Sequence, residues 1–160
     1  MNFQNIEVVL DIAARVLTCP YEGCVLTPYQ DPRGIWTYGY GSTTDLYGNP
    51  VLPTTPPLTP EQALELLKTE MTSAVQAVEA NVTVALNVNQ AAALTDFVFN
   101  CGAYALEEST LLQMLNNGEY VDAANQFARW DHAGNVQLAG LERRCMARGV
   151  LFLTQTNEPA

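Results

Sequence analysis

Glycine and proline are concentrated in one part of this 160-residue chain, between residues 32 and 57. Gly39, Gly41 and Gly48 interrupt any helix there, and the prolines of residues 50–57 predict a stiff, extended connector. The chain is therefore divided into two unlike parts, a small one in which strands are favoured and a larger one in which helices can form.

The part before the connector predicts a β-hairpin. Apolar residues at helical spacing over residues 3–17 indicate a first helix, which Pro20 ends. From Val25 to Tyr40, β-branched and aromatic residues prevail, and Asp31-Pro32-Arg33-Gly34 has proline at the second position of a turn. Two short strands joined at this turn are the simplest interpretation.

The part after the connector begins with a strong helix signal. Thr59 caps, Pro60 takes the first helical position and Gln62 completes a capping box. The apolar stripe behind it predicts a helix of about twenty residues, long enough to join two lobes. Further helices, with no strands among them, are predicted over residues 89–101, 109–116, 120–130 and 138–154.

The predicted fold class is α+β and mainly α. A single domain of residues 1–160 accommodates all the elements. It would have a small lobe at about 20–57, a connecting helix at about 60–80, and a helical lobe at about 84–155 that includes the first helix.

Charge and the N-terminal sequence restrict the class of protein. Seven basic against seventeen acidic residues give a formal net charge of -10, and no basic stripe appears, so we expect no nucleic-acid partner. The first 18 residues lack a basic start and carry Glu7, Asp11 and Arg15 within their apolar pattern. We therefore expect neither a signal peptide nor a membrane span, and a cytoplasmic protein when made.

The cysteines give no sign of a metal site. The four cysteines allow three pairings as two disulfides, but without a secretion signal free thiols are favoured. The chain has one histidine, His132, and the cysteine spacings match no usual zinc template. We expect no metal and no cofactor.

Two carboxylates stand in the small predicted lobe, where charges are few. Glu22 follows the first helix, where carbonyl dipoles and apolar surroundings favour the protonated form of a carboxyl. Asp31 and Thr37 flank the predicted turn, so a carboxylate and a hydroxyl could hold one water between them. Two carboxylates across a cleft are the minimum apparatus for cleaving a glycosidic bond.

A plainer interpretation exists for each of these residues. Glu22 can be a surface acid, Asp31 a turn residue bonded to its own backbone, and Thr37 a strand former. The residue types and spacing alone favour this structural interpretation.

A longer pattern favours the functional one. Glu22-Gly23, Asp31 eight residues after Gly23, and Thr37-Tyr38-Gly39-Tyr40-Gly41 closely resemble the phage lysozyme family, glycoside hydrolase family 24. Residues 58–63 look like the start of that family's connecting helix, and residues 97–102 resemble its F-x-F-N-x-G segment along the cleft. The resemblance covers residues 15–153, and the family's two-lobed fold agrees with the elements predicted above.

The resemblance implies a role for each site residue. Glu22 would be the general acid, Asp31 the base or electrostatic partner, and Thr37 the residue that orients the attacking water. The substrate would be peptidoglycan, cut between N-acetylmuramic acid and N-acetylglucosamine. Candidate substrate-binding residues on the cleft wall are Thr43, Phe99 and Asn100.

The resemblance also implies an endolysin, a monomer that lyses the host cell. It would collect in the host cytoplasm and reach the cell wall after a holin-like partner opens the membrane. A lytic transglycosylase is an alternative within the same class, although the Asp31 and Thr37 pair favours hydrolysis. A non-catalytic protein that binds the wall or forms part of a phage tail is an alternative from another class.

Some features depart from, or add to, the family pattern. Many members carry histidine where this chain has Ser42, so an ion pair in the small lobe would be missing. A basic residue of the last helix, Arg143 or Arg144, is expected beside Glu22. Cys24, close to Glu22, is a minor candidate for a redox gate. The net charge of -10 would repel anionic cell walls, so we expect activity to rise with moderate ionic strength or mildly acid pH.

Overall fold

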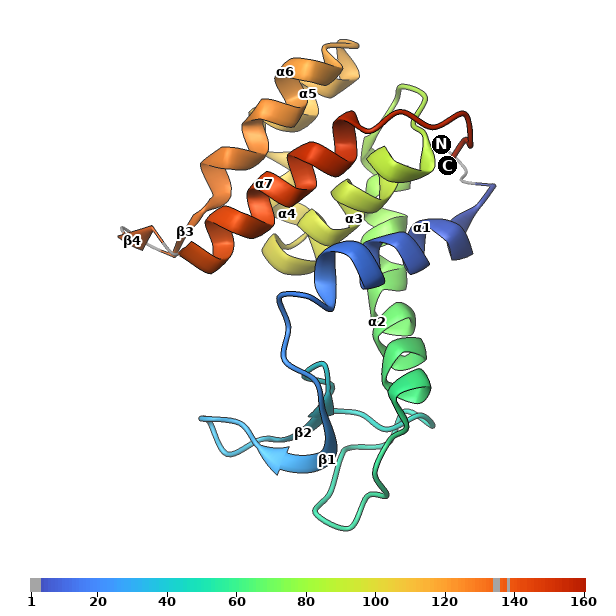
Figure 1. Cartoon of the computed structure of the whole chain (residues 1–160), viewed down its shortest axis with the longest axis vertical. Helices are drawn as coiled ribbons and strands as arrows, with labels where there is room; N and C mark the ends of the chain where they lie inside the picture. The colour runs from blue at the N-terminus through green and yellow to red at the C-terminus, as the bar shows by residue number, and fades with distance from the viewer. Residues whose placement is uncertain (1–3, 134–135, 138) are drawn as a thin grey trace.

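Helix α2, Pro60–Asn81, joins a small β-containing lobe to a larger helical lobe (Figure 1). The computed structural model describes residues 4–133, 136–137 and 139–160. Its fold is α+β and mainly α, as predicted. The capping box of α2 is also as predicted: the Thr59 hydroxyl accepts from the Gln62 amide, and the Gln62 side chain accepts from the Thr59 amide.

The N-terminal helix widens just before it reaches the small lobe. Helix α1, Ile6–Ile12, continues as a π-helical turn, Ala13–Thr18 (η1). After it, the amide of Cys19 donates to the carbonyl of Ala14, five residues back, at 2.7 Å. The helical segment ends before Pro20, where the sequence predicts its end.

The small lobe is built on the predicted hairpin. Strands β1, Val25–Gln30, and β2, Trp36–Gly39, pair antiparallel, with Tyr29 opposite Thr37 and an irregularity nearer the start of β1. The chain then runs without regular strands to α2. The lobe has its own cluster of buried side chains, made by Tyr38, Val51, Leu58, Ala63 and Leu66.

Ser42 connects the small lobe to α2. Its side chain is buried and hydrogen-bonds to the carboxylate of Glu70. Burial raises the pKa of Glu70, and the bond from Ser42 acts in the opposite direction. At the position where the sequence suggests a missing ion pair, an uncharged hydroxyl therefore hydrogen-bonds to a half-buried acid.

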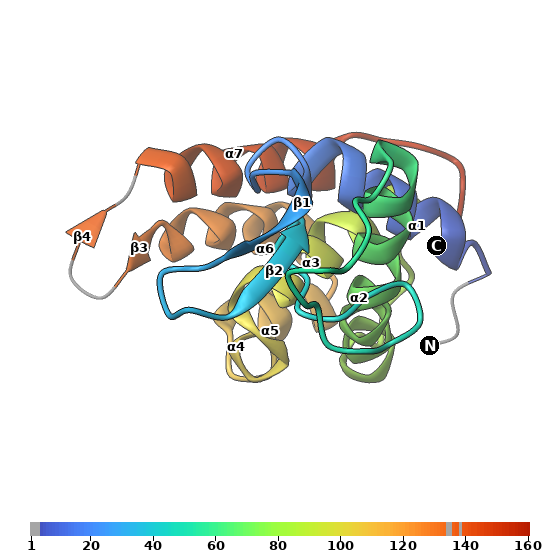
Figure 2. The ribbon, with the colours of Figure 1, turned by 90° about the horizontal axis from the view of Figure 1, so that it is seen from below.

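Helix α3, Val88–Cys101, forms the centre of the helical lobe. Most of its length is buried, and the helices of the N-terminal segment, α2 and α7 pack against it. Figure 2 shows α1 and α7 along one edge of this lobe and α4 and α5 along the opposite edge. The remaining helices are α4 (Ala103–Glu107), α5 (Thr110–Asn116), α6 (Tyr120–Gln126), the 3-10 turn η2 (Phe127–Trp130) and α7 (Ala139–Leu153).

The helical lobe is not all-helical, and here the sequence-based prediction is wrong. Strands β3, His132–Ala133, and β4, Val136–Gln137, form a two-stranded antiparallel ribbon. Strands this short show no alternation of polar and apolar residues, so periodicity cannot reveal them. In the parts of the chain that the structure describes, no helix is both long and apolar enough to cross a membrane.

Candidate active site

Glu22 lies in a tight turn directly after η1. The carbonyl of Thr18 accepts hydrogen bonds from the amides of Tyr21 and Glu22, both at 3.0 Å. The Glu22 side chain is 35% exposed, so solvent or a ligand can reach it. The turn thus fixes the backbone of Glu22 relative to the end of the N-terminal helix.

Arg144 on α7 contacts the carboxylate of Glu22. Its Nη1 donates to Oε1 of Glu22 at 2.6 Å, although the guanidinium side chain itself is only 4% exposed. This is the basic residue that the resemblance places beside Glu22. The neighbouring Arg143 is exposed, and its carbonyl accepts from the hydroxyl of Tyr21 at 3.2 Å. A charge-assisted contact of this length fixes the direction of the Glu22 carboxylate.

Asp96 on α3 binds Arg144 through the two guanidinium nitrogens that do not contact Glu22. Its Oδ2 accepts from Nε of Arg144 at 3.1 Å and its Oδ1 accepts from Nη2 at 2.7 Å. Oδ2 also accepts from Nε of Arg148 at 2.6 Å, and Oδ1 accepts from the hydroxyl of Thr18 at 2.7 Å. Three segments, η1, α3 and α7, therefore meet at one carboxylate.

The Asp96 carboxylate is fully buried. Burial alone would raise its pKa, but hydrogen bonds and positive charges from Arg144 and Arg148 outweigh burial and lower the pKa of Asp96. Sequence analysis missed this residue. The signal was present as a single charged residue in the apolar run of α3, matched by two arginines four residues apart on α7.

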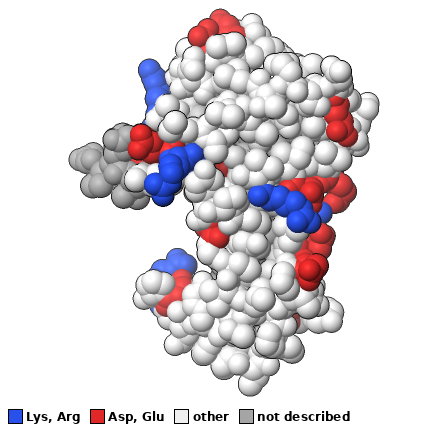
Figure 3. Space-filling model, in the orientation of Figure 1, with Lys and Arg blue, Asp and Glu red and all other residues white. Residues whose placement is uncertain are grey.

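A cavity of about 400 Å³ opens at this cluster. Its walls are Tyr21, Glu22, Asn100, Gly140, Leu141 and Arg144. The space-filling view is hollowed on one side between the two lobes (Figure 3). The described lining of this cavity includes Glu22 and Asn100 but not Asp31, Thr37, Thr43 or Phe99.

Asp31 is bound into the hairpin turn. Its Oδ1 accepts from the amides of Arg33 and Ile35, each at 2.9 Å, and its Oδ2 accepts from the Arg33 guanidinium at 3.0 Å. The bond from the Ile35 amide, followed by those from Arg33, lowers the pKa of Asp31. Asp31 is therefore an ionised and weakly basic group. It is hydrogen-bonded to the backbone of its own turn, as the plainer interpretation of the sequence predicts.

Thr37 is buried in β2, and its hydroxyl donates to the Tyr29 carbonyl at 3.4 Å. Asp31 follows Tyr29 by two residues, so the register makes Asp31 and Thr37 diagonal neighbours on one face of the hairpin. A hydroxyl in a bond this long can exchange its acceptor easily.

The three predicted substrate-binding residues have different surroundings. Thr43 is exposed, and its carbonyl accepts from the Val51 amide at 2.9 Å. Phe99 is partly buried against the main core. Asn100 is exposed, lines the cavity and accepts at Oδ1 from Nη2 of Arg148 at 3.0 Å. Asn100 is the one that shares a cavity with Glu22.

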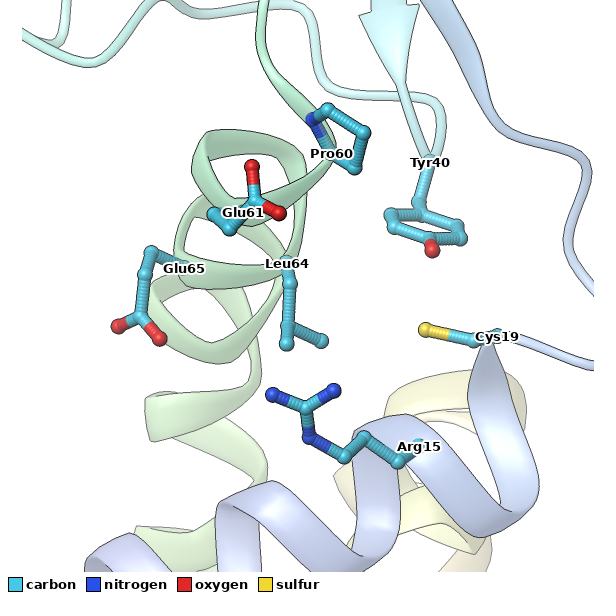
Figure 4. A pocket seen from close by; sticks show the side chains of 7 residues that line it. All are labelled: Arg15, Cys19, Tyr40, Pro60, Glu61, Leu64 and Glu65. Atoms are coloured by element: carbon cyan, nitrogen blue, oxygen red, sulfur yellow. The ribbon is translucent and has the colours of Figure 1, made fainter.

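A second cavity, of about 500 Å³, lies between the N-terminal helix and the start of α2 (Figure 4). Tyr40 points across it toward Cys19, and its hydroxyl interacts with the thiols of Cys19 and Cys24. The bond with Cys19, together with burial, raises the pKa of Tyr40. Cys24 is exposed, and all four cysteines are free thiols. Tyr40 thus ties the small lobe to the segment that carries Glu22.

The known proteins to which this chain is similar include phage lysozymes and endolysins. Residues 20–148 match the family model described as phage lysozyme. The chain is 36% identical over 141 residues to an endolysin of Acyrthosiphon pisum secondary endosymbiont phage 1, an alignment covering 86% of this chain and 92% of that one. It is 40% identical over 133 residues to the endolysin of Salmonella phage P22, covering 83% and 90%.

Among solved structures, a mutant of P22 lysozyme superposes with a TM-score of 0.77 at 34% identity, covering 96% of this chain and 99% of that one. The segment that matches the family model runs from Pro20 to Arg148. It includes every site residue predicted from the sequence.

Proposed function

Because the chain belongs to the phage lysozyme family and is therefore a peptidoglycan-degrading glycoside hydrolase, we propose that it cuts the β-1,4 bond between N-acetylmuramic acid and N-acetylglucosamine. The observation that carries the proposal is the position of Glu22. Its carboxylate is partly exposed, faces a cavity of about 400 Å³ and is held by Arg144. A fixed but accessible carboxyl is what protonation of a leaving glycosidic oxygen requires.

We assign Glu22 the role of general acid. A general acid must carry its proton when the bond breaks. A sugar that fills the cavity excludes water from Glu22, and loss of water favours the neutral carboxyl. Arg144 stabilises the carboxylate that forms once the proton has moved to the leaving oxygen.

We assign Asp31 and Thr37 the second half of the reaction. The lowered pKa of Asp31 keeps it ionised, so it can hold a water, stabilise an oxocarbenium ion and accept the proton that the water loses as it bonds to the anomeric carbon. The Thr37 hydroxyl, on the same face, supplies a second contact for that water. We therefore expect inversion at the anomeric carbon, whereas retention would require a covalent nucleophile.

Substrate contacts are proposed for Asn100, Thr43 and Phe99. Asn100 has its side-chain oxygen committed to Arg148, so its amide nitrogen is the group it can offer to a sugar. Thr43 and Phe99 are included on their place in the family motif, and the half-buried ring of Phe99 can also serve packing.

The cellular role is part of the same proposal. Two relatives described above are named endolysin, which supports lysis of a bacterial host at the end of phage growth. We propose that residues 1–160 act as one domain and as a monomer. In this proposal the protein stays in the host cytoplasm until a holin-like membrane protein lets it reach the wall.

The test is mass spectrometry of fragments released from purified peptidoglycan by the parent protein, Glu22→Gln and Glu107→Gln. Glu107 is an exposed glutamate of α4 and serves as the matched control. We expect reducing N-acetylmuramic ends from the parent and the control and almost none from Glu22→Gln. Anhydro ends would indicate a transglycosylase, and binding without fragments a wall-binding protein. If NMR shows that the new reducing end forms first as the α-anomer, the reaction proceeds with inversion.

A further inference from the structure

We infer that Asp96 is a positioning residue for Glu22 and sets the pH range in which the enzyme works. Asp96 touches neither the cavity nor Glu22 in the described contacts, and instead acts on the side chain of Glu22 through Arg144 and on its backbone through Thr18. The inference rests on the proposed role of Glu22 as the general acid.

The first route runs through the guanidinium of Arg144. Arg144 uses Nε and Nη2 for the two carboxylate oxygens of Asp96, which leaves Nη1 for Glu22. A guanidinium is planar and rigid, so fixing two of its nitrogens fixes the direction of the third. Asp96 therefore determines where Arg144 holds the carboxylate of Glu22.

The second route runs through the backbone. The Thr18 hydroxyl donates to Asp96 at 2.7 Å, and the Thr18 carbonyl accepts from the Glu22 amide at 3.0 Å. The π-helical turn ends at Thr18, so Thr18 is the last helical residue before the turn that contains Glu22. Asp96 thus fixes both ends of the Glu22 residue, its main chain and its carboxylate.

Charge gives Asp96 a second effect. With Glu22 ionised, two carboxylates face two guanidiniums, and protonation of Glu22 leaves an excess of one positive charge. Without the charge of Asp96 that excess would be larger, and the protonated acid would be harder to maintain. Asp96 therefore extends the active form of Glu22 to higher pH.

Other ionisable groups near Glu22 leave this balance in place. Asp31 pairs with Arg33 at the hairpin turn, so their charges largely cancel. Among the described residues, burial raises the pKa of the Cys101 and Cys145 thiols beside Arg148, so they are uncharged at neutral pH, and the bond with Cys19 does the same for the pKa of Tyr40. Arg143 is exposed on the surface of α7.

The experiment measures kcat and KM from pH 4 to 9 on purified peptidoglycan, with thermal unfolding of each variant. Asp96→Asn keeps the shape and removes the charge. Thr18→Val removes the hydroxyl without changing charge. Thr95→Val is the control, because Thr95 is equally buried on α3 but donates only to the Ala91 carbonyl in the described contacts.

We expect Asp96→Asn to move the alkaline limb of the kcat profile down by roughly 1 pH unit, with roughly tenfold loss of kcat above that limb. Thr18→Val should lower kcat roughly tenfold with its alkaline limb unmoved. Thr95→Val should keep the parent profile. If Asp96→Asn folds and the alkaline limb of its kcat profile lies at the same pH as in the parent protein, the inference is overturned.

If Asp96→Asn does not fold, the double variant Asp96→Asn/Arg148→Met keeps the inference testable. Removing both partners of a buried pair is often tolerated, and here it also restores the balance of charge. We expect reduced kcat with the alkaline limb near that of the parent, and parent kcat would overturn the positioning role. Parent-level cleavage by Glu22→Gln would instead refute the proposed general acid, a result that no Asp96 variant can imitate.

Discussion

Arg144 and Glu22 stand 122 residues apart in the chain, yet their side chains meet at 2.6 Å. The contact joins the last helix to the turn after the first, so the acid is held in place only once α7 has packed against α3. The orientation of Glu22 is therefore a property of the complete fold and not of the local motif that contains it.

The first prediction concerns Arg144→Lys. Lysine carries the same charge but cannot bind Asp96 with two nitrogens and Glu22 with a third. We expect kcat on purified peptidoglycan to fall by roughly tenfold to hundredfold. We also expect a loss of about 3 kcal/mol in the free energy of unfolding, because Asp96 loses part of its compensation.

Arg143→Lys is the matched control, since the same change is made one residue earlier on an exposed side chain. It should alter kcat and thermal stability little. Equal losses of kcat and stability in both variants would show that α7 tolerates neither change. The contact between Arg144 and Glu22 would then not be the cause of the loss in Arg144→Lys.

The second prediction concerns Glu70 at the contact between the small lobe and α2. Burial raises its pKa above 4.5, so the folded state holds its proton more tightly than the unfolded chain. The folded state is therefore favoured by Glu70 below that pH, and this advantage is lost as pH rises through the folded value. Glu70→Gln should raise Tm at pH 7 by about 1–3 °C and leave no such gain at pH 4.

Ser42→Ala tests the same site in the opposite direction. Without its hydroxyl, the ionised Glu70 loses a hydrogen-bond donor, so Tm should fall at pH 7 and much less at pH 4. Thermal unfolding followed by circular dichroism at both pH values measures the two effects. A gain in Glu70→Gln that is equal at pH 4 and pH 7 would contradict the role of charge.

The third prediction concerns ionic strength. The formal net charge of -10 repels an anionic wall at long range, and salt screens this repulsion. Activity on whole peptidoglycan should rise from low salt to about 0.15 M, where the screening length is near 8 Å. On the face shown in Figure 3, most basic side chains lie close to acidic ones.

A rate that falls steadily over this range would show that local positive charge at the cavity governs binding more than the overall charge does. Soluble glycan fragments without peptide acids provide the control, because they lack most of the wall charge. Their cleavage should depend little on salt.

Much of the fold was predictable because its signals are local. The capping box at Thr59, the turn from Asp31 to Gly34 and the stop at Pro20 each act within a few residues. The ribbon of β3 and β4 and the single turn of α4 were missed because they are too short to show a period.

The site was predictable only in part, for a different reason. The resemblance named Glu22 and a basic partner on the last helix, and the structure selects Arg144 over Arg143. Asp96 and Thr18 join the same cluster through contacts between three helical segments, which no spacing along the chain encodes. A lone aspartate in an apolar helix was the one visible sign of it.

The π-helical turn at Ala13–Thr18 has a consequence for how this chain can vary in length. Each residue added to or removed from a helix rotates everything after it by about 100° around the helix axis. The π-helical turn holds one residue more than an α-helix needs for the same rotation, so a single deletion within it would leave Thr18 facing Asp96, whereas an insertion would turn Thr18 away. The angular position of Thr18 therefore determines where Glu22 points, and this turn should tolerate the loss of one residue but not the gain of one.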